Sequence, residues 1–100
     1  MKINLFKIKD GKLETWLEWG RLIMGINKKE AIDTLKEEGL TYEACGVFLI
    51  DKNYYTIGIF EGKALPENMN RKLNVIHKEK KKECLKYIGP VELSYELYSN

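Results

Sequence analysis

The chain has 100 residues, 44% of them hydrophobic, so its length and composition predict one folded domain over residues 1–100 and exclude global disorder. Its 17 basic and 15 acidic residues give a formal charge of +2, too balanced to indicate a nucleic-acid partner from composition alone. A chain this short buries only part of its unfolded surface, so stabilisation by a partner chain is a reasonable expectation.

No apolar run approaches the ~20 residues needed to cross a bilayer, so no membrane segment is expected. Strand-like alternation starts at Ile3, directly after Met1 and Lys2, and leaves no room for a signal peptide. We therefore expect a cytoplasmic protein. Cys45 and Cys84 lack CxxC spacing, which in a cytosolic chain predicts two separate buried thiols.

The first half of the chain predicts a strand followed by a helix. Residues 3–9 alternate with the period of two expected of a strand, and Asp10-Gly11 ends it. Apolar residues then recur at three- and four-residue spacings, which predicts one stripe of a helix. This stripe consists of Leu13, Trp16, Leu17, Gly20 and Met24.

A second helix is predicted over residues 28–38. Asn27 followed by Glu30 has the spacing of an N-cap and its capping-box partner. Gly39 is suited to the left-handed conformation that ends many helices. The first helical segment is therefore expected to be split in two.

The second half predicts a hairpin, a helix and a last strand. The β-rich runs 41–50 and 54–62 are joined by the turn-prone residues 51–53. A long helical run follows at 67–87, with Pro66 near its first turn, and Gly89-Pro90 ends it. Alternation over residues 91–99 predicts the last strand.

The resulting β-α-β-β-α-β order predicts an α+β, ferredoxin-like fold with a four-stranded antiparallel sheet and helices on one face. Both faces of each predicted hairpin strand are apolar. In residues 41–50, Phe48 and Ile50 alternate with Val47 and Leu49, and in residues 54–62, Ile57 and Ile59 alternate with Thr56 and Phe60. Helices can cover only one of these faces, so the other is either a binding surface or half of a sheet-on-sheet core. We favour the second alternative, which is a homodimer.

The stretch IHKEKKKECL, residues 76–85, holds the only histidine. On a helical wheel of about 100° per residue, His77, Lys80 and Cys84 fall on the same side as Leu73, the side expected to meet the sheet. An unpaired ammonium or imidazole is costly there unless it has a partner or a water-filled space. His77 is therefore either a hydrogen-bonded core residue, with Lys80 extending to an edge, or part of a cavity wall.

Candidate partners for His77 are a carboxylate, an amide and several hydroxyls. They are Glu43, Asn74 and the side chains of Tyr42, Tyr54, Tyr55 and Tyr95. If Glu43 reaches His77, the pair could shuttle a proton, because a carboxylate orients an imidazole and sustains its charged form. The candidate catalytic residues are Glu43 and His77, and the candidate ligand-binding residues are Trp16, Tyr55, Asn74 and Lys80. Each also has a purely structural interpretation.

Three stretches carry a resemblance to a known family: FKIKDGK leading into WLEW, DTLKEEGLTYEA entering the second strand, and His77 with Glu83-Cys84-Leu85 downstream. In these features the chain resembles small bacterial and archaeal proteins of the dimeric α+β barrel superfamily, related in fold to antibiotic-biosynthesis-type monooxygenases. The helix with the histidine in that family reads I-D-x-x-H. Here LNVIH places Asn74 where an aspartate is usual, which argues against an Asp–His relay.

The resemblance implies a homodimer whose two sheets pack face to face into a barrel, with a pocket between each sheet and its helices. Relatives in the superfamily use such pockets for cofactor-free oxygenation of polyphenols, for haem degradation, or for isomerisation and cyclisation. Fold alone selects none of these activities. The function expected is therefore small-molecule binding, with a cofactor-independent monooxygenase-like or isomerase-like activity as its extension.

No cofactor or metal site is expected, because the chain lacks HExxH, cysteine pairs, an acidic loop, a P-loop and a dinucleotide fingerprint. Two rival functions stay open. One is a ligand-free structural or regulatory dimer. The other is an RNA-binding module, which shares the order of elements but is disfavoured because YYTIGIF lacks the basic-Gly-aromatic pattern of that motif.

Overall fold

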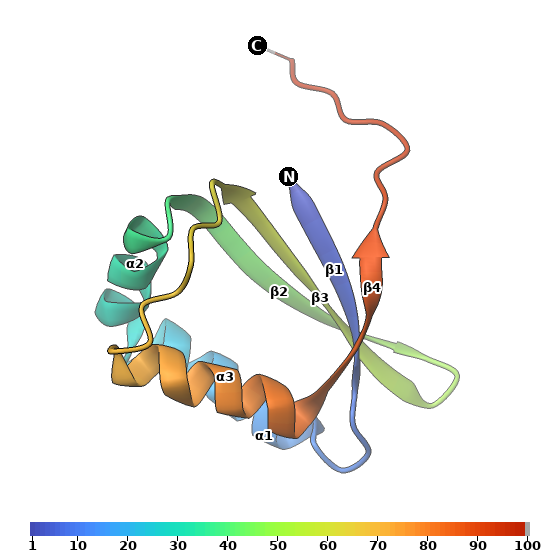
Figure 1. The fold of residues 1–100 in the computed structure, drawn as a ribbon. Helices are drawn as coiled ribbons and strands as arrows, with labels where there is room; N and C mark the ends of the chain where they lie inside the picture. The colour runs from blue at the N-terminus through green and yellow to red at the C-terminus, as the bar shows by residue number, and fades with distance from the viewer. Residues whose placement is uncertain (100) are drawn as a thin grey trace.

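The computed structural model describes residues 1–99 and shows an antiparallel sheet of four strands with helices against one face (Figure 1). In chain order the elements are β1 (Lys2–Ile8), α1 (Leu13–Met24), α2 (Lys28–Glu37), β2 (Leu40–Ile50), β3 (Asn53–Gly62), α3 (Lys72–Cys84) and β4 (Leu85–Val91). The strands lie in the order β2-β3-β1-β4, so β2 and β4 are the edges. The α+β class and the split first helical segment agree with the sequence-based prediction.

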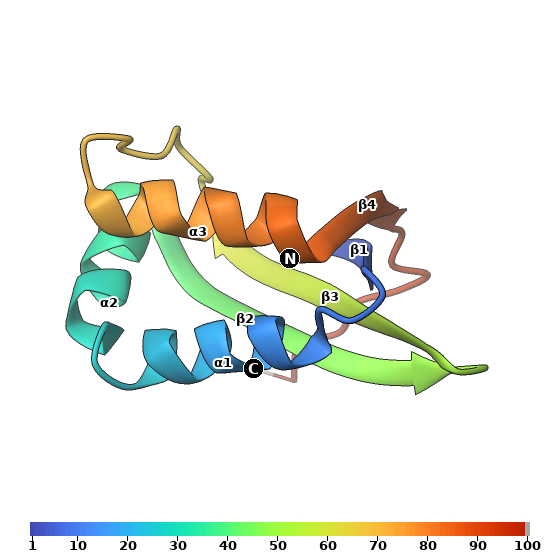
Figure 2. The same ribbon diagram turned by 90° about the horizontal axis from the view of Figure 1, so that it is seen from below.

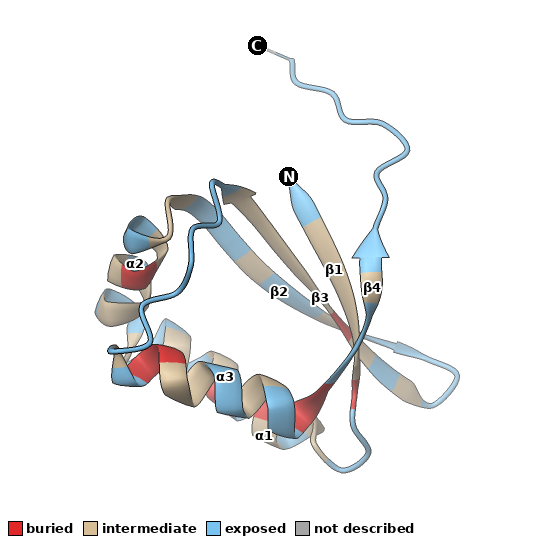
Figure 3. Cartoon of the chain, viewed as in Figure 1, coloured by how far each residue is buried: buried red, intermediate tan, exposed pale blue. Residues whose placement is uncertain are grey.

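The three helices form one layer, in which α1 and α3 lie side by side and α2 stands at one end (Figure 2). Their contacts bury a small core that extends along α3, from Leu73 near its start to Leu85 at the start of β4 (Figure 3). The buried apolar residues are Ile8, Trp16, Trp19, Leu73, Cys84 and Leu85. In the described part of the chain, no helix combines the length and the apolar character that crossing a membrane requires.

The ends of α1 and α2 differ in part from the prediction. Met24 is 71% exposed, while Trp19, which lies outside the expected stripe, is buried. Asn27 occupies the N-cap position of α2, but its side chain makes no capping hydrogen bond. Gly39 does follow α2 in the left-handed conformation, with a φ of +67°.

The predicted hairpin is confirmed. Ile50 pairs with Asn53, so the turn consists of Asp51 and Lys52 alone. Both residues have positive φ, +46° and +70°, which is the type I′ geometry that matches the twist of the flanking strands. The resulting long ribbon of β2 and β3 forms one half of the sheet.

The boundary between the last helix and the last strand is wrong in the prediction. α3 spans Lys72–Cys84, shorter than the expected 67–87, and Leu85 is already extended, with φ −121° and ψ 144°. The strand is β4, not residues 91–99, and it contains Gly89-Pro90. An edge strand tolerates proline, because one row of its amides needs no partner within the sheet. Pairing of Leu85 and Tyr87 with β1 outweighs the helical pattern.

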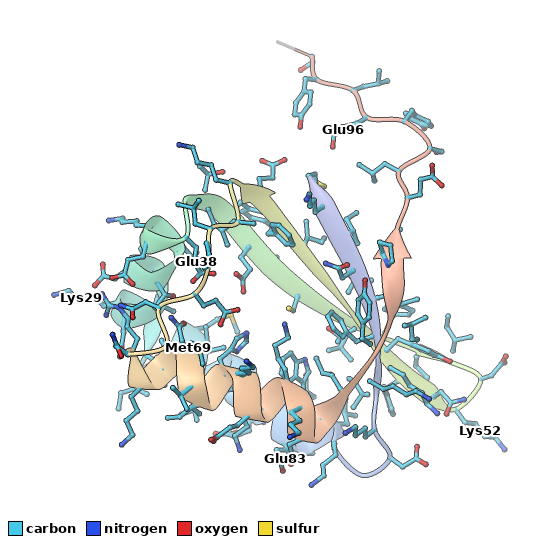
Figure 4. All side chains as sticks on the ribbon, viewed as in Figure 1. Lys29, Glu38, Lys52, Met69, Glu83 and Glu96 are labelled. Carbon is cyan, nitrogen blue, oxygen red and sulfur yellow. The ribbon has the colours of Figure 1, made fainter. Side chains whose placement is uncertain are left out.

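Residues 92–99 form no strand and extend away from the sheet, as the position of Glu96 shows (Figure 4). Tyr95 and Leu97 in this segment are 77% and 83% exposed. Their alternating pattern is that of a strand, but β1 already pairs with β3 and β4 on its two sides. Sequence alternation alone therefore does not supply the neighbour that a strand needs.

The sheet presents an inner face to the helices and an outer face away from them. Phe6, Ile8 and Val47 are on the inner face, since they belong to or pack against the buried core. Alternation and register place on the outer face Ile3, Leu5, Tyr42, Phe48, Ile50, Tyr55, Ile57 and Ile59. None of these outer-face residues is buried. The sequence-based expectation that one apolar face lacks a helical cover is met.

Thr56 on the inner face gives a test of this core. Its side chain is fully buried, and its Oγ1 has no hydrogen-bond partner within residues 1–99. Thr56→Val is expected to raise the free energy of unfolding by about 1 kcal/mol, because the substitution removes an unsatisfied buried hydroxyl at nearly constant volume. Urea denaturation of the wild type and the variant measures the change.

Thr34→Val is the matched control. The Thr34 hydroxyl is also buried, but it donates a hydrogen bond of 2.6 Å to the carbonyl of Ala31. This variant is expected to lower the free energy of unfolding. Destabilisation by Thr56→Val as large as that by Thr34→Val would contradict the assignment of an unpaired hydroxyl at Thr56.

Candidate functional site

The helical layer leaves part of the inner face of β2 open. An added Cβ at Gly58 would lie 3.8 Å from Cε1 of Phe6 and 3.9 Å from Sγ of Cys45, which places these side chains together on the inner face. Glu43 lies two residues before Cys45 and therefore points the same way. Both Glu43 and Cys45 keep an exposed fraction, although the surrounding protein partly desolvates them. The prediction of two buried thiols is therefore wrong for Cys45 and confirmed for Cys84. We call the space between this face of β2 and α3 the cleft, because the charge of Lys81 on α3 acts across it on both Glu43 and Cys45.

His77 on α3 is fixed by a tryptophan of α1. Nε1 of Trp19 donates a hydrogen bond of 2.8 Å to Nδ1 of His77, and the two rings are stacked at 6.0 Å between centroids. Burial, reinforced by the Lys81 ammonium, lowers the pKa of His77 to about 4. At neutral pH the imidazole is therefore uncharged, with Nδ1 accepting from Trp19 and the proton on Nε2.

Lys81 is a residue of the cleft that the sequence analysis missed. Its Nζ lies 5.5 Å from the centroid of the Phe6 ring on the sheet. Its charge influences the pKa values of Glu43, Cys45 and His77, so it lies among them. On the helical wheel Lys81 falls about 40° from His77, and this spacing could have identified it.

The electrostatics of the cleft favour uncharged side chains. Burial raises the pKa of Glu43, the Lys81 ammonium opposes this rise, and Glu67 adds to it. Burial also raises the pKa of Cys45 to about 11, with a further contribution from Glu43. Cys45 is therefore a thiol at neutral pH and a weak nucleophile, because the thiolate is the reactive form.

Three of the predicted site residues lie together on the helical side. The ring centroids of Trp16 and His77 are 6.3 Å apart. Asn74 is buried one turn before His77, and its Nδ2 donates a hydrogen bond of 3.0 Å to the carbonyl of Asn68. Asn74 thus holds the loop that precedes α3. Its amide does not contact His77 through any hydrogen bond within residues 1–99.

The other predicted site residues are spread over three places. Glu43 stands on the opposite wall of the cleft, and no hydrogen bond joins it to His77 among the described residues. Lys80 forms an ion pair of 3.7 Å with Glu83 and lines a separate hollow of about 430 Å³ beside Trp19. Tyr55 stacks on Phe48 at 5.7 Å on the outer face, away from the cleft.

One hollow adjoins the imidazole directly. It has a volume of about 370 Å³ and is lined by Glu67, Met69, His77, Lys78 and Lys81. Met69 lies in the loop that leads into α3, at the opposite end of the helix from Glu83 (Figure 4). The hollow therefore combines hydrogen-bond donors, one carboxylate and an apolar thioether, a mixture suited to a small polar ligand.

Comparison with known proteins reveals no similarity on which an assignment of the fold or the site could rest. No protein-family model matches the chain, and no curated protein or solved structure compared with it is significantly similar. The resemblance to dimeric α+β barrel proteins therefore stays a prediction. Residues 1–99 contain no group of three or more His, Cys, Asp or Glu side chains placed to hold a metal ion.

The low pKa of His77 predicts a specific dependence of stability on pH. In the unfolded chain the imidazole has its ordinary pKa of 6.5, and in the folded protein its pKa is about 4. Between these values the unfolded state binds more protons, so the free energy of unfolding falls as the pH drops from about 6.5 to about 4. The slope is up to about 1.4 kcal/mol per pH unit.

The matched control is His77→Gln, because the carboxylates of Glu37 and Glu83 have lowered pKa values and add acid sensitivity of the same sign. Urea denaturation at a series of pH values is expected to show a steeper fall for the wild type than for the variant. Parallel curves for the two proteins would contradict the assignment of a neutral His77.

Proposed function

We propose that the chain forms a homodimer that binds a small molecule in the cleft between its sheet and helices. The observation that carries this proposal is the open inner wall of β2, where Glu43 and Cys45 face the helices and are still exposed. Across the cleft stand His77 and Lys81, beside a hollow of about 370 Å³. Polar groups on two facing walls are the usual composition of a ligand site.

The outer face of the sheet supports the homodimer. It carries a continuous apolar surface that includes Ile57, Ile59 and the stacked pair Phe48 and Tyr55, none of them buried. An apolar sheet face of this kind is stable in water when a second sheet packs on it. The ferredoxin-like, dimeric α+β barrel suggested by the sequence is the arrangement that we propose. Free thiols at Cys45 and Cys84 are compatible with a cytoplasmic location.

The chemistry that fits the cleft is abstraction of a proton from a weakly acidic ligand. Glu43 has a raised pKa and is therefore a stronger base than an ordinary carboxylate. In this step the Glu43 carboxylate takes the proton, the electron pair stays on the ligand, and the Nε2–H of His77 donates a hydrogen bond to the resulting anion. Cofactor-independent oxygenation and isomerisation both begin with such a step, and we propose one of these reaction classes.

RNA binding is a second candidate, and one observation favours it. Phe48 and Tyr55 form an aromatic pair on the outer face, where RNA-recognition domains stack bases. The same residues cannot serve both a dimer interface and an RNA platform. The oligomeric state therefore distinguishes the two functions.

A charge on the outer face is expected to dissociate the dimer. Light scattering should show the wild type as a dimer and Ile57→Glu as a monomer, because the carboxylate would be buried without a partner in the interface. Ile26→Glu is the matched control, since Ile26 is 86% exposed in the turn after α1. It is expected to stay dimeric. A monomeric wild type would overturn the dimer and favour the RNA platform.

Ligand binding in the cleft is tested by thermal shift with small phenolic and haem-like compounds. At least one compound is expected to raise the melting temperature of the wild type, because occupancy of the cleft stabilises the folded state. The increase should disappear in His77→Ala and persist in Lys82→Ala, whose side chain is exposed on the same helix. Equal increases in all three proteins would remove His77 from the site. No increase with any compound would favour a ligand-free structural or regulatory dimer.

A further inference from the structure

Trp19 determines which nitrogen of His77 carries the proton. An indole N–H is only a donor, so Nδ1 of His77 must accept the 2.8 Å hydrogen bond and cannot itself be protonated. The neutral imidazole then has its proton on Nε2. His77 lines the 370 Å³ hollow, so this N–H is the polar group that the ring has available for a ligand.

Lys81 brings a positive charge to the same hollow without a close counter-ion. Its side chain is half-buried, and among the described residues no carboxylate lies within 4.0 Å of its ammonium group. Glu43 and Glu67 act on this part of the cleft through their charge, but neither forms an ion pair with Lys81. A partly desolvated ammonium group is stabilised by an anion that enters its vicinity.

The surrounding charges limit which anion fits. Lys78 adds a second positive charge to the lining, and Glu67 adds a negative one. Glu67 and the nearby Glu43 balance the charge of Lys78 and Lys81, so the hollow has no excess positive charge to favour a doubly charged group such as phosphate over a carboxylate. Met69 and the ring of Phe6 offer apolar contact to the remainder of a ligand.

From this geometry we infer that Trp19 holds His77 as an Nε2–H donor, and that this donor and the Lys81 ammonium together bind the carboxylate of a small organic acid. The inference rests on the proposed ligand site and names its ligand class. It makes Lys81 a ligand-binding residue, and it makes Trp19 a positioning residue that acts through His77.

The tautomer can be measured directly, because His77 is the only histidine of the chain. Nitrogen-15 NMR of the ring at neutral pH is expected to show a protonated Nε2 and an unprotonated Nδ1 in the wild type. Trp19→Phe removes the donor and should give a mixture of tautomers and a higher pKa of His77. A protonated Nδ1 in the wild type would overturn the role assigned to Trp19.

Ligand class is tested with benzoate and its uncharged counterpart benzamide, followed through the His77 ring signals at millimolar concentrations. Benzoate is expected to bind and benzamide is not. Lys81→Met should weaken benzoate binding about tenfold or more, since it removes a charge-assisted hydrogen bond. Lys82→Met changes the formal charge equally and is expected to weaken binding less than about threefold, because the Lys82 side chain is exposed and does not line the hollow.

The outcomes separate this inference from the function on which it rests. Equal binding of benzoate and benzamide, or equal losses in Lys81→Met and Lys82→Met, would overturn the carboxylate site and leave a small-molecule cleft in place. Binding of neither probe, together with no response to the phenolic and haem-like compounds, would overturn both. Trp19 is in the core, so Trp19→Phe can fail to fold. Lys81→Met and its control Lys82→Met then still test the carboxylate site.

Discussion

The helical layer is joined to the sheet most directly where α3 passes into β4. Cys84 and Leu85 are consecutive residues on the two elements, both buried, and they pack with Ile8 at the end of β1. Because no loop separates α3 from β4, the axis of the helix is fixed relative to the edge of the sheet. The other end of the layer is carried by α2, which contacts the start of β2. Between these two supports the inner face of β2 stays accessible, and this is the physical origin of the cleft.

The partial cover determines the chemical state of the side chains in the cleft. Complete burial would demand a hydrogen-bond partner for every polar group, and full exposure would leave the pKa values at their ordinary positions. The cleft lies between these limits. Desolvation is the largest influence on Glu43, Cys45 and His77, and in each case it disfavours the charged form. Lys81 supplies a positive charge among these three groups, which makes it the feature most able to discriminate between ligands.

The elements that local chemistry specifies were predictable from the sequence, and those that depend on pairing were not. The hairpin turn follows from Asp51-Lys52, and the end of α2 follows from Gly39, because each requires only a local backbone conformation. The change from helix to strand at Leu85 depends on the partner strand β1, which the sequence pattern of residues 85–91 does not reveal. For this reason the alternating pattern placed the start of the last strand at residue 91, six residues after its observed start at Leu85.

The residues of the candidate site were likewise predictable only in part. The helical wheel correctly brought His77 to the side that meets the rest of the protein, but it could not show that a tryptophan on α1 would occupy Nδ1. Lys81 was within reach of the same wheel and was passed over in favour of Lys80. Lys80 instead pairs with Glu83 and lines the separate hollow beside Trp19. The wheel places both lysines near the side of His77, and contacts with other segments decide which of the two faces the cleft.

The two faces of the sheet are physically connected through β2 and β3. Successive residues of these strands alternate between the inner and the outer face of the sheet. Cys45 and Thr56 face inward, and their neighbours Gly46 and Tyr55 face outward. Among the described residues, β2 is an edge strand that pairs with β3 alone. A second copy packed on the outer face would restrain this ribbon and, through it, the position of Glu43 opposite α3. A dimer interface and a preorganised cleft would then be two consequences of one packing event, because residues one apart on the same strands serve both.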